Sequence, residues 1–172
     1  MATANSPTDE TADREIVITR VFDAPRELVW RAWTEPDRLM RWWAPRDFTT
    51  PFCTVDLRLG GVFHYCMRSP NGQDIWGKGV YREISAPERI VYVDSFSDPE
   101  GNTVLPTHYG LSPSHPTETV VTVTFAEHEG GTELTLRHAI PKATLERGGT
   151  EQGWGEMLDR LAEDFDRAGG EV

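Results

Sequence analysis

The sequence predicts an α+β fold in which a long C-terminal helix packs on an antiparallel sheet. Residues 52–139 alternate between apolar and polar side chains, as strands with one buried face do. Residues 150–168 return to the spacing of an amphipathic helix, and a strand with two short helices precedes the sheet. An antiparallel sheet with one helix on it buries one face, so we expect the core between these two elements.

The length and composition predict a single domain. The chain has 172 residues, of which 38% are hydrophobic and 10% aromatic. This is enough for one sizeable core, which we place at residues 15–170. The preceding residues 1–14, MATANSPTDETADR, are polar and predict a disordered tail. They also lack the apolar core of an export signal.

The charge of the chain argues against several kinds of partner. A net charge of -11 and a pI near 4.8 speak against nucleic-acid or anionic-membrane surfaces, which need clustered lysine and arginine. No apolar run reaches the ~18 residues of a membrane span, so we expect no membrane insertion. Cys53 and Cys66 form no CxxC pair and suit a reducing compartment. We therefore expect a cytoplasmic protein, and the sequence leaves open whether it forms a homodimer.

The N-terminal segment predicts one strand and two short helices. EIVITRVF at 15–22 is rich in β-branched residues, as strands are. Pro25 suits the first turn of a helix, whose apolar stripe consists of Val29, Trp30 and Trp33. Pro36 begins a second helix, which Pro45 ends. Its apolar side is expected to carry Leu39, Met40 and Trp43.

The sequence predicts about six antiparallel strands over 52–139. One face of the strand at 62–68 carries Phe63, Tyr65 and Met67. Asn71-Gly72 suits the positive φ of a hairpin turn. Gly77 and Gly79 alternate along the next strand and should leave room for a neighbouring backbone, the helix or a ligand. The stretch 97–116 contains four prolines, and we expect it to be a stiff lid.

The last segment predicts a strongly amphipathic helix at 150–168. Its apolar stripe consists of Trp154, Leu158, Leu161, Phe165 and Ala168. Gly153 and Gly155 flank Trp154. They indicate either a kinked first turn or a thin helix segment beside a cavity, with Trp154 in the cavity wall.

Few residues carry recognisable chemistry. The five histidines lack the spacing of metal ligands, so we expect no metal, and we expect no cofactor. GLSPS at 110–114 lacks the last glycine of a nucleophile elbow. His138 shares a strand face with two leucines, so it is either a hydrogen-bonded core residue or a ligand-contacting or proton-transfer group. The pattern does not place Glu83 or Asp94 inward or outward.

Four motifs, in this order, resemble one protein family. They are FDAPRELVWRAWTEPDRLMRWWAP, GGVFHYCMRSPNG, GKGVYREISAPERIVY and QGWGEMLDRLAE. They are typical of bacterial proteins similar to the C-terminal domain of the heat-shock-protein-90 ATPase activator, within the START-like, helix-grip superfamily that includes the birch pollen allergen. The resemblance covers about residues 15–168. It implies a curved seven-stranded antiparallel sheet that grips the C-terminal helix, with a hydrophobic cavity between them.

The resemblance also implies where ligands would bind. The second short helix would cap the cavity mouth. Trp42 and Trp43 point about 100° apart on it, so at least one should contact the cavity. His108 and Tyr109 should be the lid residues nearest the mouth. The expected cavity residues are Trp42, Trp43, Phe63, Tyr65, Met67, Trp76, His108, Tyr109, His138 and Trp154.

The resemblance does not imply one function, because relatives include chaperone activators, polyketide cyclases, lipid carriers and an antibiotic-resistance protein. We expect binding of a hydrophobic or aromatic small molecule by a carrier, a sensor or a sequestering protein. A polyketide cyclase-like enzyme is the alternative, with His138, Tyr65 and His108 as candidate polar groups. A chaperone ATPase regulator is a more remote alternative, because the eukaryotic activator uses two domains and this chain has one.

Overall fold

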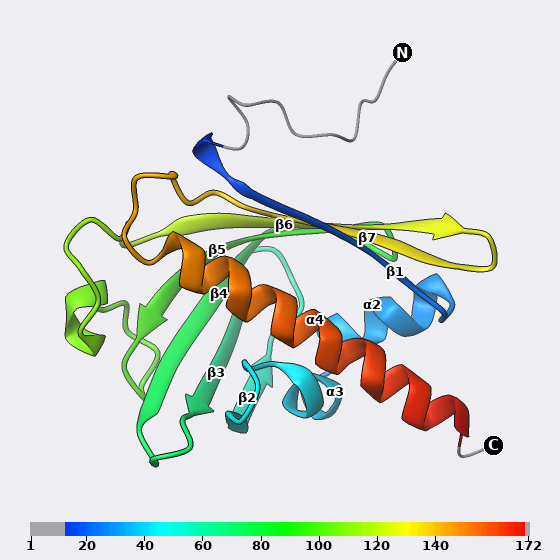
Figure 1. The fold of residues 1–172 in the computed structure, drawn as a ribbon, viewed down its shortest axis with the longest axis horizontal. Coiled ribbons are helices and arrows are strands. Elements are labelled where there is room, and N and C mark those ends of the chain that lie inside the picture. The colour runs from blue at the N-terminus through cyan, green and yellow to red at the C-terminus, as the bar shows by residue number, and fades with distance from the viewer. Residues whose placement is uncertain (1–12, 171–172) are drawn as a thin grey trace.

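A curved, seven-stranded antiparallel sheet wraps around a long helix in the computed structural model, which describes residues 13–170 (Figure 1). The strands are β1 (Ile16–Phe22), β2 (Thr49–Val55), β3 (Val62–Arg68), β4 (Asp74–Ser85), β5 (Arg89–Ser97), β6 (Thr119–His128) and β7 (Gly131–His138). Their order across the sheet is β1-β7-β6-β5-β4-β3-β2. The predicted helix-grip fold class is confirmed. Of the expected tail, residues 1–12 lie outside the described residues.

The first strand pairs with the last. β1 runs antiparallel to β7, from Ile16 opposite His138 to Phe22 opposite Thr132. Side chains alternate along β7, and Leu134 and Leu136 are fully buried. His138 therefore points to the same inner face of the sheet as these leucines.

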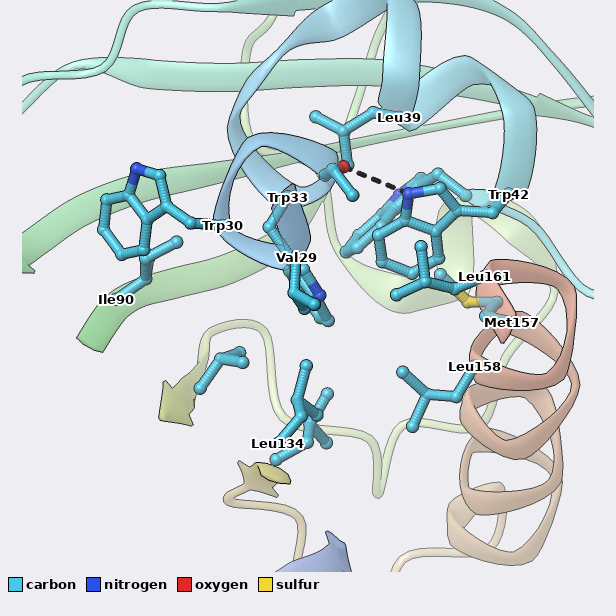
Figure 2. Packing of buried hydrophobic residues seen from close by; sticks show 14 of the residues in the cluster. Val29, Trp30, Trp33, Leu39, Trp42, Ile90, Leu134, Met157, Leu158 and Leu161 are labelled. Carbon is cyan, nitrogen blue, oxygen red and sulfur yellow. Dashed lines mark hydrogen bonds between the residues drawn. The ribbon is translucent and has the colours of Figure 1, made fainter. Parts of the chain in front are cut away.

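Helices α2 (Arg26–Thr34) and α3 (Pro36–Trp42) close one end of the sheet (Figure 1). Figure 2 shows how Trp33, Leu39 and Trp42 pack in the same cluster as Leu158 and Leu161 from the long helix. The expected position of Met40 on the apolar side of α3 is wrong, because this side chain is 37% exposed. Leu39 and Trp42 share the buried side instead, as residues three apart on a helix do.

The long helix α4 (Arg147–Gly170) crosses the inner face of the sheet (Figure 1). It begins three residues earlier than the predicted 150. Its buried side chains are Trp154, Met157, Leu158, Leu161 and Phe165. Phe165 packs edge-on against Phe22 of β1, with ring centroids 5.7 Å apart. Ala168, which was expected in the apolar stripe, is exposed, so the buried stripe ends at Phe165.

The proline-rich segment 97–116 is held against the ends of β4 and β5. It contains a short 3-10 helix, η1 (Pro106–Tyr109). The Tyr109 hydroxyl donates to the Ser97 carbonyl at 2.6 Å and accepts from the Trp76 backbone N–H at 3.2 Å. On the outer face of the sheet, Lys78 Nζ donates to the Gly101 carbonyl at 3.0 Å. The segment thus covers the outer side of the sheet near these strand ends.

Candidate functional site

A cavity of about 570 Å³ lies between the inner face of the sheet and the first turns of α4. Its aromatic wall residues include Trp43, Phe48, Tyr65, Phe96 and Trp154. Met67, Ile75 and Met157 add apolar surface. Sites for small molecules typically measure roughly 300–1,000 Å³ and have mostly apolar walls. The cavity has the size and character of such a site.

Two glycines on β4 make room for tyrosine rings inside the sheet. Tyr65 on β3 pairs with Gly77 on β4, and a Cβ atom at Gly77 would lie 2.4 Å from the Tyr65 hydroxyl oxygen. A Cβ atom at Gly79 would lie 2.6 Å from the ring of Tyr92. The glycines therefore accommodate neighbouring side chains, and not the backbone, helix or ligand that the sequence led us to expect.

Trp43 connects the two short helices to the cavity wall. It caps the C-terminus of α3 and is 2% exposed. Its ring packs edge-on against Phe63, Tyr65 and Trp154, with centroids 5.0, 5.5 and 5.4 Å away. Trp42 lies behind it, where its indole N–H donates to the Ala32 carbonyl at 3.1 Å. The adjacent tryptophans thus serve different surfaces, one at the cavity and one in the core.

One polar cluster interrupts the apolar wall. Asp94 on β5, Tyr65 on β3 and His138 on β7 converge there. The Tyr65 hydroxyl donates to Asp94 Oδ1 at 3.4 Å, and His138 Nε2 lies 3.9 Å from Asp94 Oδ2. Thr119 Oγ1 lies 2.7 Å from His138 Nε2, and the Trp154 indole N–H donates to His138 Nδ1 at 3.0 Å. Four strands, β3, β5, β6 and β7, therefore meet α4 at one polar point.

His138 is a neutral member of this cluster. An indole N–H can only donate, so Nδ1 must accept and the ring proton belongs on Nε2, which can donate to Thr119. Burial lowers the pKa of His138 to about 3, and His115 adds to this effect by charge repulsion. The imidazole thus stays uncharged at neutral pH.

Asp94 is an acid whose charge is disfavoured by its surroundings. Burial raises its pKa to about 7, although the Tyr65 hydroxyl acts in the opposite direction by donating to the carboxylate. A quarter of the side-chain surface remains accessible, and Asp94 lines the cavity. Burial first, and then the neighbouring Asp94, raise the pKa of Tyr65 well above its usual value. Near neutral pH, Asp94 is the group of this cluster that gains or loses a proton.

The residues just before α4 and in its first turn line a solvent-facing side of the cavity, here called its mouth. They are Leu145, Glu146, Gly149 and Thr150, of which Leu145 is 77% exposed. Glu146 accepts hydrogen bonds from the backbone N–H of Ser112 at 2.7 Å and from its hydroxyl at 2.9 Å. The backbone N–H of Ser112 is the main cause that lowers the pKa of Glu146, so this rim carboxylate is charged.

The structure brings some of the expected cavity residues together and separates others. Trp43, Tyr65, Met67, His138 and Trp154 line the cavity. Trp76 also borders it, but its ring packs against Phe52 and His64. Those residues lie on the outer face, because Trp76 pairs with Cys66 rather than with Tyr65.

Four expected cavity residues lie elsewhere. Trp42 and Phe63 pack in the core behind the wall. His108 and Tyr109 do not line the cavity, and their rings contact each other in η1, where Tyr109 also packs on Phe96. The proline-rich segment thus contacts the rim through Ser112, and it contacts the wall where Tyr109 packs on Phe96. Residues 145–150 form the rim itself.

The most important residue missed by the sequence analysis is Asp94. Its strand also places Ile90 and Tyr92 in the core, and Asp94 follows Tyr92 by two residues. This alternation was the available signal, but the opposite face of β5 is also buried, so the signal did not place Asp94 inward. Glu146 had no such signal, because it precedes the helix in an irregular segment.

Neither a metal-binding cluster nor a membrane-spanning helix is found within residues 13–170. In this part of the chain, no group of three or more His, Cys, Asp or Glu side chains is arranged to hold a metal ion. Nor do these residues include a helix that is both long and apolar enough to span a membrane.

Known proteins share this fold and part of this sequence. The family model described as Activator of Hsp90 ATPase homolog 1-like protein matches residues 23–166. A solved structure from Chromobacterium violaceum is 30% identical, with a TM-score of 0.69, over 87% of this chain and 95% of that chain. A Nitrosomonas europaea structure is 23% identical, with a TM-score of 0.74, over 92% of this chain and 98% of that chain.

A further structure, the AHSA1 protein from Silicibacter pomeroyi, is 19% identical, with a TM-score of 0.70, over 90% of this chain and 99% of that chain. At these identities, the Nitrosomonas and Silicibacter structures show the fold alone. None of the curated proteins compared with the chain matches it.

Proposed function

We propose that this chain, which belongs to the family of Activator of Hsp90 ATPase homolog 1-like proteins, binds a small molecule with an apolar, aromatic body between the sheet and α4. One observation carries the proposal: the cavity of about 570 Å³ has aromatic walls and a polar cluster around Asp94. Small-molecule sites combine these features, because apolar walls give affinity and a few polar groups fix orientation. Carrier, sensor and sequestration roles would all use such binding.

The tryptophans of the wall provide the measurement. We expect the neutral probe 9-hydroxymethylanthracene to quench tryptophan fluorescence in a saturable manner, because Trp43 and Trp154 line the cavity. Replacement of Tyr65 by Ala should weaken binding by about 1–3 kcal/mol, since the probe loses a buried aromatic contact. Fluorescence titration of both proteins measures the two dissociation constants.

A matched control lies on the opposite face of the sheet. Phe52 packs against His64 and Trp76 outside the cavity, so Phe52→Ala should bind the probe as the unchanged protein does. Circular dichroism of each variant checks that it is folded. If a broad panel of hydrophobic probes gives no saturable quenching, the small-molecule proposal fails.

One observation favours a second candidate, a polyketide cyclase-like enzyme. An acid with a pKa of about 7 beside a tyrosine hydroxyl suits proton transfer near neutral pH. Incubation with a polyketide-like substrate, followed by mass spectrometry, separates the two candidates. A covalently altered product that is lost in Asp94→Asn would favour the enzyme, whereas recovery of unchanged substrate would favour the binding protein.

A further inference from the structure

Among the described residues, the ionisable side chains that line the cavity are either acids or neutral groups. Asp94 and Glu146 are the acids of its wall, and His138 is neutral. Within residues 13–170, neither lysine nor arginine lines the cavity. An anionic ligand would therefore meet two carboxylates and no compensating cation, which is unfavourable at low dielectric.

Asp94 has unused capacity to accept hydrogen bonds. A carboxylate offers about four acceptor positions on its two oxygens. Oδ1 receives one long hydrogen bond, of 3.4 Å, from Tyr65. Oδ2 lies 3.9 Å from His138 Nε2, beyond hydrogen-bond distance, and the proton of Nε2 is directed to Thr119. The carboxylate thus faces the cavity without a cationic partner among the cavity-lining residues.

We infer that the ligand of this cavity carries a protonated amine on its apolar body, and that Asp94 binds the amine. The inference rests on the proposed function, because it names the class of molecule that the same cavity would take. An ammonium group would give the Asp94 carboxylate both the cationic partner and the hydrogen-bond donors that it lacks.

The aromatic wall suits the same group. The faces of tryptophan and tyrosine rings attract cations, more strongly where water is excluded. Tyr65 contacts Asp94 directly, and Trp154 contacts its neighbour His138. An amine at Asp94 would thus lie among aromatic rings. The ionised Glu146, which also lines the cavity, adds a negative potential there.

Because Asp94 attracts an ammonium group most strongly when it is ionised, the inference predicts that the affinity for the amine depends on pH. The titratable groups that face Asp94, or that face its direct partners, are Tyr65, Tyr92, Cys53, His138 and His115. Glu146 lines the same cavity. The tyrosines and Cys53 have raised pKa values and stay neutral, His138 stays neutral, and Glu146 stays charged. Asp94, with its pKa of about 7, is therefore the group whose ionisation we test, and an Asp94→Asn variant removes it.

The experiment uses three probes that share one ring system. 9-Aminomethylanthracene is cationic, 9-hydroxymethylanthracene is neutral and anthracene-9-carboxylate is anionic. At about pH 8, we expect the unchanged protein to bind the amine about tenfold more tightly than the alcohol, and the carboxylate least tightly. Between about pH 6 and about pH 8, the affinity for the amine should rise roughly tenfold as Asp94 ionises, while that for the alcohol stays nearly constant.

Two variants test the role of Asp94. In Asp94→Asn, the affinity for the amine should fall to that for the alcohol, and its pH dependence should disappear. Asp166→Asn makes the same change of net charge at an exposed site on α4 and should retain the preference for the amine.

The outcomes distinguish this inference from the proposed function. Equal binding of amine and alcohol by the unchanged protein would overturn the inference and leave the proposed function standing. A preference for the amine that survives in Asp94→Asn would also overturn it. Absence of saturable binding for all three probes would overturn the proposed function, and the inference with it.

Discussion

At the scale of single residues, Asp94 and His138 should give stability opposite pH dependences. The pKa of Asp94 rises on folding from 3.8 to about 7, so the folded state binds this proton more tightly and loses stability as pH increases through that range. The pKa of His138 falls from 6.5 to about 3, so the folded state gains stability as pH increases from about 3 to 6.5. The two effects largely oppose each other in mildly acidic solution.

Asp94→Asn should reveal this opposition. Because asparagine does not ionise, the variant avoids the cost of a buried charge above neutral pH. We expect the free energy of unfolding of Asp94→Asn, relative to the unchanged protein, to rise by about 2–4 kcal/mol between about pH 4 and about pH 8. Urea unfolding at several pH values measures this difference.

The exposed variant Asp166→Asn serves as the control for that measurement. Its curve of stability against pH should run nearly parallel to that of the unchanged protein. A parallel curve for Asp94→Asn as well would mean that Asp94 titrates alike in the folded and unfolded states. The cavity would then not bury its charge.

His138 and Asp94 also differ in whether the orientation of their side chains could be predicted from the sequence. His138 could be placed inward because Leu134 and Leu136 precede it at alternate positions. Asp94 could not, because β5 also buries Ser95 and Ser97 on its outer side, where the proline-rich segment covers the sheet. Burial of both faces removes the contrast on which a period-two argument depends.

At the scale of elements, α4 should be the helix on which the core depends most. Leu161 is fully buried, in the same cluster as Trp42 and Leu158 (Figure 2). Leu161→Ala should lower the free energy of unfolding by about 2–5 kcal/mol, because the lost methyl groups leave a cavity. Thermal or urea unfolding measures the change. Asp166→Ala, on the exposed side of the same helix, should alter stability by less than about 0.5 kcal/mol.

The elements themselves were largely predictable, but their contacts were not. Hydrophobic spacing located most strands and α4, since elements such as β6 and β7 bury one face more than the other. The role of residues 97–116 was harder to predict, because it depends on contacts such as that between Ser112 and Glu146, 34 residues apart. Local patterns carry no signal for such a pair. We therefore expected residues of the proline-rich segment at the cavity mouth, whereas residues 145–150 form its rim.

At the scale of the whole molecule, the cavity remains open partly because two of the α4 positions that line it carry no side chain. Gly149 and Gly153 lie one helical turn apart, and both line the cavity. A Cβ atom at Gly149 would meet no atom within 4 Å, and one at Gly153 would meet only Pro45, at 3.8 Å. Glycine within a helix costs about 1 kcal/mol relative to alanine. The two glycines thus make α4 less stable than alanines would, at positions that leave space in the cavity for a ligand.

Gly153→Leu should therefore make the protein more stable and weaken its binding of the probe. The new side chain has room in the cavity, so helix propensity and apolar burial should together raise the free energy of unfolding by about 1–2 kcal/mol. The same side chain should weaken the saturable binding of 9-hydroxymethylanthracene, because it occupies part of the cavity volume. Gly155→Ala is the matched control. Gly155 does not line the cavity, so this variant should gain about 0.5–1 kcal/mol from helix propensity and bind the probe normally. A Gly153→Leu protein that binds the probe as tightly as the unchanged protein would place the binding site outside this cavity.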